Sequence, residues 1–162
     1  MNFKILPMTK NDLESIKDVL FIDFDDFWNY NTFCSELDNS NSEYIVCRFN
    51  DNIVGFAGIL KVLDEVHITN IVVKKDLRKM GIGSILLEKL IEMAKLHNAT
   101  LITLEVNCKN ASAYQLYLKH NFKVVGFRKK YYNNTDDAII MTLKFDKNKE
   151  ETKDEKESWI KF

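Results

Sequence analysis

The sequence is poor in the residues that mark several specialised protein classes. Among its 162 residues it has one proline, five glycines and three cysteines. So little proline and glycine argues against collagen-like and low-complexity chains. Cys34, Cys47 and Cys108 are an odd number with no Cys-x-x-Cys spacing, which favours reduced, buried thiols over disulfides or a zinc site. We therefore expect a globular protein with no metal.

The sequence also lacks an excess of either charge and a long apolar run. Its 23 Lys and Arg residues nearly balance 24 Asp and Glu residues, so no overall positive field favours a nucleic acid partner. Stretches such as Ile53–Leu60 are well short of the ~18 to 20 apolar residues of a membrane span. Residues Met1–Lys4 do not begin a secretory signal. These absences predict a cytoplasmic protein that binds neither nucleic acid nor membrane.

What is present has the size and composition of one domain. A chain of 162 residues, 46% of them hydrophobic and 29% charged, can bury roughly two thirds of its unfolded surface. Its character changes near Asp146, after which Lys, Glu and Asp dominate before an aromatic end at Trp159 and Phe162. We predict a domain over residues 1–145 and a charged C-terminal tail over 146–162. The tail is either solvated or docked through its aromatic residues.

The spacing of apolar residues alternates between the strand period and the helix period. Strands are expected at residues 3–6, 43–49, 53–62, 66–73, 101–106, 122–128 and 138–144. Helices are expected from residue 9 or 11 through Leu20, from Ile82 through Ala94 and over residues 111–120. The strands from 43 to 73 read as an antiparallel meander and the last two as an antiparallel pair. This order predicts an α/β domain on a mixed sheet.

A glycine-containing turn separates the strand that ends near Val73 from the helix that begins near Ile82. Its sequence is Arg78-Lys79-Met80-Gly81-Ile82-Gly83-Ser84. A helix opened by glycines presents unpaired N–H groups and the positive end of its dipole, which favour a phosphate. By itself the pattern fits a plain loop equally well. It lacks the Lys-Ser/Thr pair of a P-loop and the third glycine of a dinucleotide fingerprint.

Three polar residues follow on the next strand and helix. Glu105 ends an otherwise apolar strand, where open α/β sheets place ligands. Taken singly, Glu105 also fits a solvated strand end, Asn110 a helix N-cap and Tyr117 a core position.

Together, these motifs resemble the GNAT acyl-CoA N-acetyltransferases, and most of all the RimI-type ribosomal-protein alanine N-acetyltransferases. The matching segments are Arg78-x-x-Gly81-x-Gly83, Leu104-Glu105-Val106, Asn110-x-x-Ala113-x-x-Leu116-Tyr117 and Gly126 to Tyr132. The resemblance runs from Met1 to Lys144. It implies the GNAT fold, a mixed, mostly antiparallel sheet of about seven strands flanked by helices. It also implies transfer of an acetyl group from acetyl-CoA to a protein N-terminal α-amine, with a ribosomal-protein alanine as acceptor.

The resemblance also implies roles for individual residues. The phosphate loop falls on Arg78, Lys79, Met80, Gly81, Ile82, Gly83 and Ser84. The pantetheine arm pairs with the backbone of Ile71, Val72 and Val73 and is held by Asn110. The general base maps to Glu105 and the general acid to Tyr117. Asn121 stands where the family often has a glycine, and Asn133 stands where RimI-type enzymes commonly have a proline.

Residues that recognise the acceptor are predicted on chemical grounds. A protonated N-terminus would be attracted by Asp64, Glu65 and Glu105. Tyr131, Tyr132 and Trp28 could wall a peptide groove. Solvated turns explain the first two carboxylates equally well, and core packing explains Trp28. A small amine, a lysine side chain, or a non-catalytic acetyl-CoA-binding module stay open as alternatives.

Overall fold

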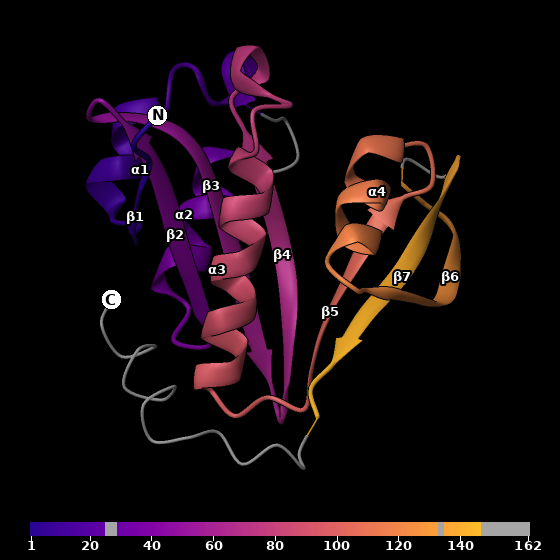
Figure 1. Cartoon of the computed structure of the whole chain (residues 1–162). Helices are drawn as coiled ribbons and strands as arrows, with labels where there is room; N and C mark the ends of the chain where they lie inside the picture. Colours follow the sequence, from indigo (N-terminus) through magenta and orange to yellow (C-terminus); the bar gives the residue numbers. More distant parts are fainter. Residues whose placement is uncertain (25–28, 133–134, 147–162) are drawn as a thin grey trace.

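The computed structural model describes residues 1–24, 29–132 and 135–146, and a seven-stranded sheet with the order β1-β2-β3-β4-β5-β7-β6 forms its centre (Figure 1). The strands are β1 (Lys4–Pro7), β2 (Ser42–Phe49), β3 (Asn52–Val62), β4 (Glu65–Val73), β5 (Leu101–Asn107), β6 (Lys123–Tyr132) and β7 (Asp136–Lys144). The helices are α1 (Lys10–Ile16), α2 (Tyr30–Asp38), α3 (Ile82–Leu96) and α4 (Ala111–Lys119), with a π-helix η1 (Leu20–Phe24) and a 3-10 turn η2 (Lys75–Leu77).

Every pair of neighbouring strands is antiparallel except β4 and β5, which are parallel. This arrangement confirms the predicted α/β class and mixed sheet. The strand β7 ends at Lys144. The predicted tail, apart from Asp146, lies outside the described residues, as does Trp28.

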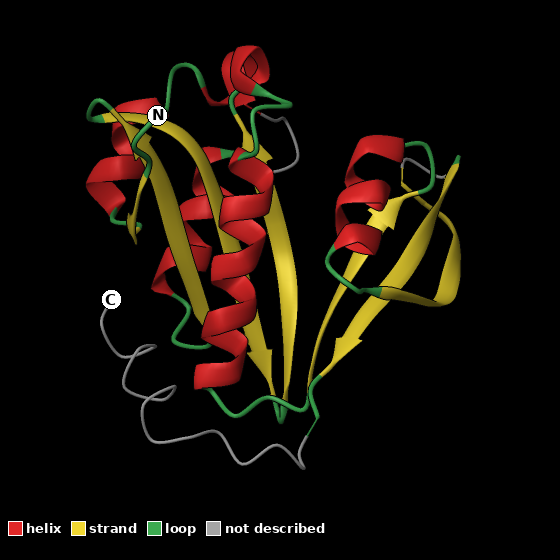
Figure 2. Ribbon diagram, in the orientation of Figure 1, coloured by secondary structure: helices red, strands yellow, loops and turns green. Residues whose placement is uncertain are grey.

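Helices cover both faces of the sheet (Figure 2). The alternation along β2 shows the reason, since successive side chains of a strand point to opposite faces. Ile45 and Cys47 join the apolar cluster under α3 and α4, whereas Tyr44 and Val46 join the cluster under α1 and α2. Each face of the central strands is therefore buried, which explains the nearly continuous apolar run of β3.

The N-terminal helical region differs from the prediction in two ways. The expected continuous helix through Leu20 stops at Ile16, because Lys17 and Val19 donate to carbonyls only three residues back. Leu20 then begins the π-helix and is still buried. The helix α2 was not predicted, since Phe33 is the one fully buried side chain among its nine residues and the apolar period is weak.

The turn after α4 and the exposure of the cysteines bear on two further predictions. Asn121 adopts a left-handed φ of 68° after α4, as predicted for a helix stop. The buried-thiol prediction is right for Cys47, where burial raises the pKa to about 11. It is wrong for Cys108, which is exposed because it lies in the turn after β5.

Gly58 on β3 leaves room for a buried ring. A β-carbon there would lie 2.1 Å from Cε1 of Tyr44. The ring of Tyr44 cannot retreat easily, because it packs 5.2 Å from the ring of Phe33 and its hydroxyl lies 3.0 Å from Oγ1 of Thr69. We expect Gly58→Ala to lower the free energy of unfolding by about 1–3 kcal/mol or more, measured by urea denaturation. Gly126→Ala is the control, since its β-carbon would meet Ile140 at an ordinary 3.6 Å; equal losses in both variants would contradict this reasoning.

Asp12 links α1 to the sheet and should make stability depend on acid pH. Burial works to raise the pKa of its carboxyl, but hydrogen bonds from the Thr9 N–H (2.8 Å) and from Arg48 outweigh burial and hold the pKa below its ordinary value. The resulting stabilisation is present above the unfolded pKa of ~3.9 and is lost as pH falls through the folded pKa. Asp12→Asn should therefore cost about 1–2 kcal/mol at neutral pH in urea unfolding. The difference from wild type should shrink as pH falls below ~4 and disappear once pH is below the folded pKa. Asp18→Asn, at an exposed position, should have little effect at either pH.

Candidate functional site

An opening in the middle of the sheet creates the site. The parallel strands β4 and β5 pair only from Glu65 to His67, opposite Leu101 to Thr103. Beyond these three positions the strands diverge, and Figure 1 shows β4 and β5 spreading apart with α3 and α4 on either side of the gap. The second half of β4 thus has backbone groups facing the gap with no β5 partner, which a ligand could pair with as an added strand.

A bulge in β4 sets which side chains face this opening. Gly58 pairs with Asn70 and Ile59 with Ile68, so Thr69 is an extra residue on β4. A bulge of this kind reverses the alternation of side chains after it. Ile71 and Val73 consequently pack with the cluster under α3, whereas Val72 packs with the cluster under α1 and α2.

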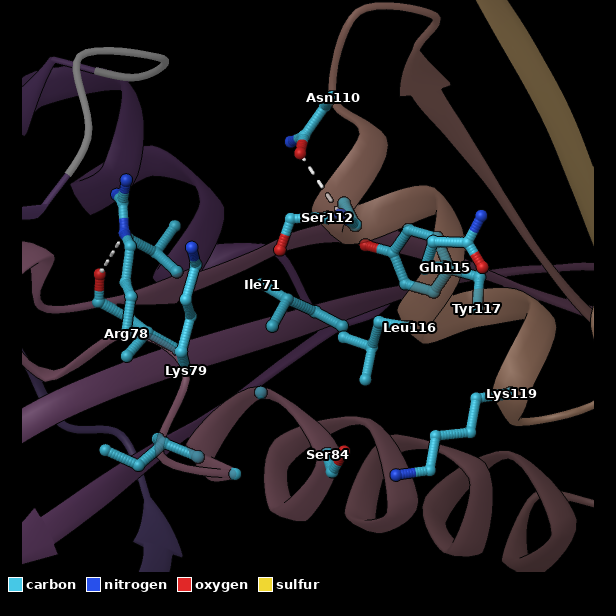
Figure 3. Close-up of a pocket in the computed structure, with 16 residues that line it drawn as sticks. Ile71, Arg78, Lys79, Ser84, Asn110, Ser112, Gln115, Leu116, Tyr117 and Lys119 are labelled. Carbon is cyan, nitrogen blue, oxygen red and sulfur yellow. Dashed lines mark hydrogen bonds between the residues drawn. The ribbon is translucent and has the colours of Figure 1, made fainter.

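A pocket of about 510 Å³ occupies the gap on the α3 and α4 side (Figure 3). Its lining comes from β4, the loop before α3, the start of α3, and α4. The lining residues are Ile71, Val72, Val73, Arg78, Lys79, Gly81, Ile82, Gly83, Ser84, Asn110, Ser112, Ala113, Gln115, Leu116, Tyr117 and Lys119. Eleven of these are among the predicted cofactor and catalytic residues; Met80 is not in the lining, and its side chain is 41% exposed.

The loop before α3 gives the pocket an anion-binding end. Gly81 is the N-cap of the 15-residue α3, with a left-handed φ of 87° and no side-chain capping hydrogen bond. A β-carbon at Gly81 would have no neighbour within 4 Å, so the space beside it is open. The first N–H groups of α3 and its dipole therefore face the pocket unshielded, an arrangement that suits a phosphate.

Arg78 braces this loop. Its Nε donates to the carbonyl of Val73 at 3.2 Å and its Nη2 donates to the carbonyl of Phe24 at 3.0 Å. These bonds tie the loop both to the end of β4 and to η1. Lys79 has a left-handed φ of 64° and lines the pocket with its own cationic side chain.

Tyr117 is the buried polar residue of the pocket. It lies on α4, packs 5.8 Å from the ring of Phe122, and is only 8% exposed. Burial raises the pKa of its phenol well above the usual value, so the hydroxyl keeps its proton throughout the neutral range. In Figure 3 the hydroxyl end of Tyr117 is turned toward the side of the pocket where Ile71 lies.

The other pocket-lining residues of α4 and its N-cap were only partly predicted from the sequence. Asn110 is the N-cap of α4, where its side chain accepts the Ala113 N–H at 3.1 Å, and it also lines the pocket. Ser112, Gln115 and Lys119 line the pocket without having been predicted. Their spacing of three and four residues puts them on one face of α4, which is the signal that could have found them. A polar helix face more often points to solvent, so the spacing alone did not single them out.

Glu105 lies on the opposite face of the sheet from the pocket. Its neighbours on β5, Leu104 and Val106, pack in the cluster that holds Tyr117, so Glu105 points the other way. Its Oε1 lies 2.8 Å from Nη2 of Arg128 on β6. Glu105 and Tyr117 therefore come from the two sides of the same opening.

The predicted acceptor residues divide into two groups. The hydroxyl of Tyr132 donates to the backbone oxygen of Glu105 at 3.2 Å, and the rings of Tyr131 and Tyr132 meet edge to face at 5.0 Å. Burial first, and the charge of Glu105 second, raise the pKa of Tyr132 to about 12. Glu65 is apart from this cluster: it starts β4 opposite Leu101, about 13 Å along the strand direction from Glu105, and it pairs with His67 at 3.1 Å.

Together the two faces combine complementary chemistry. The pocket side has the open N-terminus of α3 and the hydroxyl of Tyr117. The other side has the carboxylate of Glu105 near the rings of Tyr131 and Tyr132. Within residues 1–24, 29–132 and 135–146, no three His, Cys, Asp or Glu side chains are grouped so that they could hold a metal ion. No helix in the described part of the chain combines the length and apolar character that crossing a bilayer requires.

Comparisons with known proteins match the chain to acetyltransferases. The family model described as the Acetyltransferase (GNAT) family matches residues 11–122. The ribosomal protein bS18-alanine N-acetyltransferase of Escherichia coli (strain K12) is 36% identical over 121 residues, which cover 72% of this chain and 80% of that protein. An N-alpha-acetyltransferase of Sulfolobus acidocaldarius is 27% identical over 154 residues, covering 87% of this chain and 92% of that protein.

A solved structure agrees with these relatives. The crystal structure of the ribosomal-protein-S18-alanine N-acetyltransferase from Escherichia coli matches with a TM-score of 0.82 and 29% identity, covering 92% of this chain and 97% of that one. The resemblance predicted from the motifs is thereby confirmed.

Proposed function

The chain belongs to the GNAT acetyltransferase family and is an N-acetyltransferase, and from this premise we propose that it transfers the acetyl group of acetyl-CoA to the α-amine of a protein N-terminus. The observation that carries the proposal is the gap between β4 and β5, which has Tyr117 on one face and Glu105 on the other. Two substrates could enter from opposite faces and meet in such a gap.

Acetyl-CoA fits the pocket side of the gap. The open N-terminus of α3 at Gly81 suits the pyrophosphate, and the cationic side chains of Lys79 and Lys119 line the same pocket. The unpaired edge of β4 over Ile71 to Val73 suits the amide groups of the pantetheine arm. A volume of about 510 Å³ is within the usual range for a ligand site.

The reaction forms one bond and breaks one. The acceptor nitrogen bonds to the thioester carbonyl carbon, the carbon–sulfur bond breaks, and one proton passes from the nitrogen to the departing sulfur through the residues of the site. Acetyl transfer of this kind needs a neutral amine, a stabilised oxyanion and a protonated leaving group. A backbone N–H near Val72, on the unpaired edge of β4, would stabilise the oxyanion.

Tyr117 would protonate the leaving sulfur. Its raised pKa keeps the hydroxyl protonated at neutral pH, so the proton is available at the moment the thiolate forms.

Glu105 would receive the proton from the acceptor. A carboxylate is a much weaker base than an amine, so we propose that Glu105 acts through a bound water or by holding the amine. The demand on the base is mild for an N-terminus. An α-amine with a pKa of ~7.8 is roughly a quarter free base at pH ~7.4, whereas a lysine at ~10.4 is about 0.1% free base.

The acceptor we propose is an N-terminal alanine of a ribosomal protein. The names of the Escherichia coli relative and of its structure support this acceptor, and the Sulfolobus relative supports N-terminal α-amines more broadly. A ribosomal-protein acceptor would place the reaction in the cytoplasm. Tyr131 and Tyr132 would line the groove for the acceptor, with Glu65 at its far end.

The test offers acetyl-CoA and short peptides that begin with Ala, Ser, Met or Gly. Thiol release and the mass and position of the added acetyl group are measured. We expect acetylation at the amino terminus with alanine preferred. The control is an N-blocked peptide that contains lysine, and a higher rate on this control would overturn the α-amine assignment. Binding of acetyl-CoA with no peptide modified would favour a small amine or a non-catalytic module instead.

A further inference from the structure

The carboxylate of Glu105 is paired with a cation on the acceptor face. Nη2 of Arg128 lies 2.8 Å from Oε1 of Glu105, and the side chains are 55% and 26% exposed respectively. An ion pair this accessible to water contributes little to the stability of a fold. Because the ion pair includes the proposed base Glu105, it can instead affect the reaction.

The strand β6 holds Arg128 in place. A bulge sets residues 129–131 opposite the single residue Asp137. Within the bulge, Lys130 has a left-handed φ of 51°, and its N–H donates to the Asp137 carboxylate at 2.9 Å. The bulge brings the ring of Tyr131 back over the strand, so that the guanidinium carbon of Arg128 lies 4.9 Å from the ring centroid. A guanidinium stacked on an aromatic ring keeps a defined position beside its carboxylate.

The other strands bring no second cation into contact with Glu105. On β7 the residue opposite Glu105 is the apolar Ile140. On β4 the titratable residues are Glu65 and His67, which pair with each other opposite Leu101 and Thr103. On β6, Tyr132 contacts the Glu105 backbone with a neutral hydroxyl. Among the residues that the structure describes, Arg128 is therefore the cation that contacts this carboxylate.

We propose that Arg128 is a positioning residue that balances the charge of Glu105, so that the site binds the acceptor amine in its neutral, nucleophilic form. The proposal rests on the proposed function, in which the amine reaches Glu105. A lone carboxylate would stabilise the ammonium form, which has no lone pair with which to attack the thioester. The guanidinium offsets that attraction. Because it contacts Oε1, the carboxylate keeps lone pairs for a water or for the amine itself.

The experiment compares Arg128→Gln with wild type in the dependence of kcat on pH, using the preferred peptide and acetyl-CoA. The pH dependence of kcat reports the pKa values of groups in the bound complex, whereas that of kcat/KM reports the pKa values of the free amine and the free enzyme. We expect the rising limb of kcat to move to higher pH by about one unit, with kcat at pH ~7 about tenfold lower. The KM for the peptide should fall at the same pH, because the unbalanced carboxylate binds the ammonium form more tightly.

Two matched variants test the role of charge. Lys129→Gln removes the same charge from the next, exposed residue of β6 and should leave both the profile and KM unchanged. Arg128→Lys keeps the charge and should retain most of the wild-type profile. A limb that does not move in Arg128→Gln, or that moves equally in Lys129→Gln, would overturn the proposal. An Arg128→Lys variant that behaves like Arg128→Gln would also overturn it.

A second background shows whether Arg128 acts through Glu105. In Glu105→Gln the carboxylate charge is gone, so adding Arg128→Gln should no longer move the kcat limb to higher pH. A full shift in that background would contradict the inference. Wild-type protein that acetylates no amino terminus would instead refute the proposed function, so the two failures are distinguishable.

Discussion

Replacing Tyr117 by phenylalanine should lower kcat for acetyl transfer about 10²- to 10⁴-fold while leaving the affinity for acetyl-CoA nearly unchanged. The substitution removes one hydroxyl from a residue that is 8% exposed, so the packing against Phe122 is retained. In the proposed mechanism, this removes the proton donor for the leaving sulfur. Steady-state kinetics gives kcat, and calorimetric titration with acetyl-CoA gives the affinity.

Tyr114→Phe is the matched control for this prediction. Tyr114 lies on the same helix α4, and it is not among the residues that line the pocket. Its variant should keep kcat within about threefold of wild type. An equal loss in both variants would indicate a general disturbance of α4 and not the loss of a proton donor. Full activity of Tyr117→Phe would favour the non-catalytic module or a different acid.

The second large effect is expected for Glu105→Gln, which should lower kcat/KM for an N-terminal peptide about 10²-fold near pH ~7. The amide keeps the shape of the side chain and its place on β5 but cannot accept the acceptor proton. The loss should narrow as pH rises, because more of the free amine is then neutral without help from the enzyme. Rates measured across the pH range with one peptide separate this outcome from a uniform loss.

Glu43→Gln controls for the removal of a negative charge from the same sheet. Glu43 lies on β2, which β3 separates from β4, and it pairs with His97. It should leave kcat/KM near the wild-type value at every pH. A Glu105→Gln variant with wild-type activity would exclude Glu105 as the proton acceptor. A loss that is the same at all pH values would assign Glu105 to holding the peptide and not to moving a proton.

Part of the site could be predicted from the sequence because it is contiguous along the chain. The loop from Arg78 to Ser84 places its glycines and its helix start within seven residues, so local rules of helix initiation identify it. Sequence also placed Tyr117 on a helix and Glu105 on a strand. It could not show that Arg78 would brace the loop through the carbonyls of Val73 and Phe24, because Phe24 is 54 positions away.

Other parts depend on which strands become neighbours. Glu105 on β5 and Arg128 on β6 are separated by β7, so their ion pair across that strand depends on the strand order of the sheet. The bulge at residues 129–131 places the ring of Tyr131 against Arg128. Likewise, the strand pattern predicted β4 and β5 but not that their pairing stops at His67. A strand period of two residues reports which face a side chain takes, and it carries no information on the length of a ladder.

The residues alone were enough to predict the α/β class, the family resemblance, the glycine-containing loop before α3 and the polar residues of the site. These properties follow from periodicity and from motifs whose members are near one another in the chain. The folded chain was needed to reveal the opening between β4 and β5, the placement of Tyr117 and Glu105 on opposite faces of it, and the pairing of Glu105 with Arg128. Strand order, ladder length and bulges are set by packing across the whole sheet, so they depend on residues that are distant from one another in the chain.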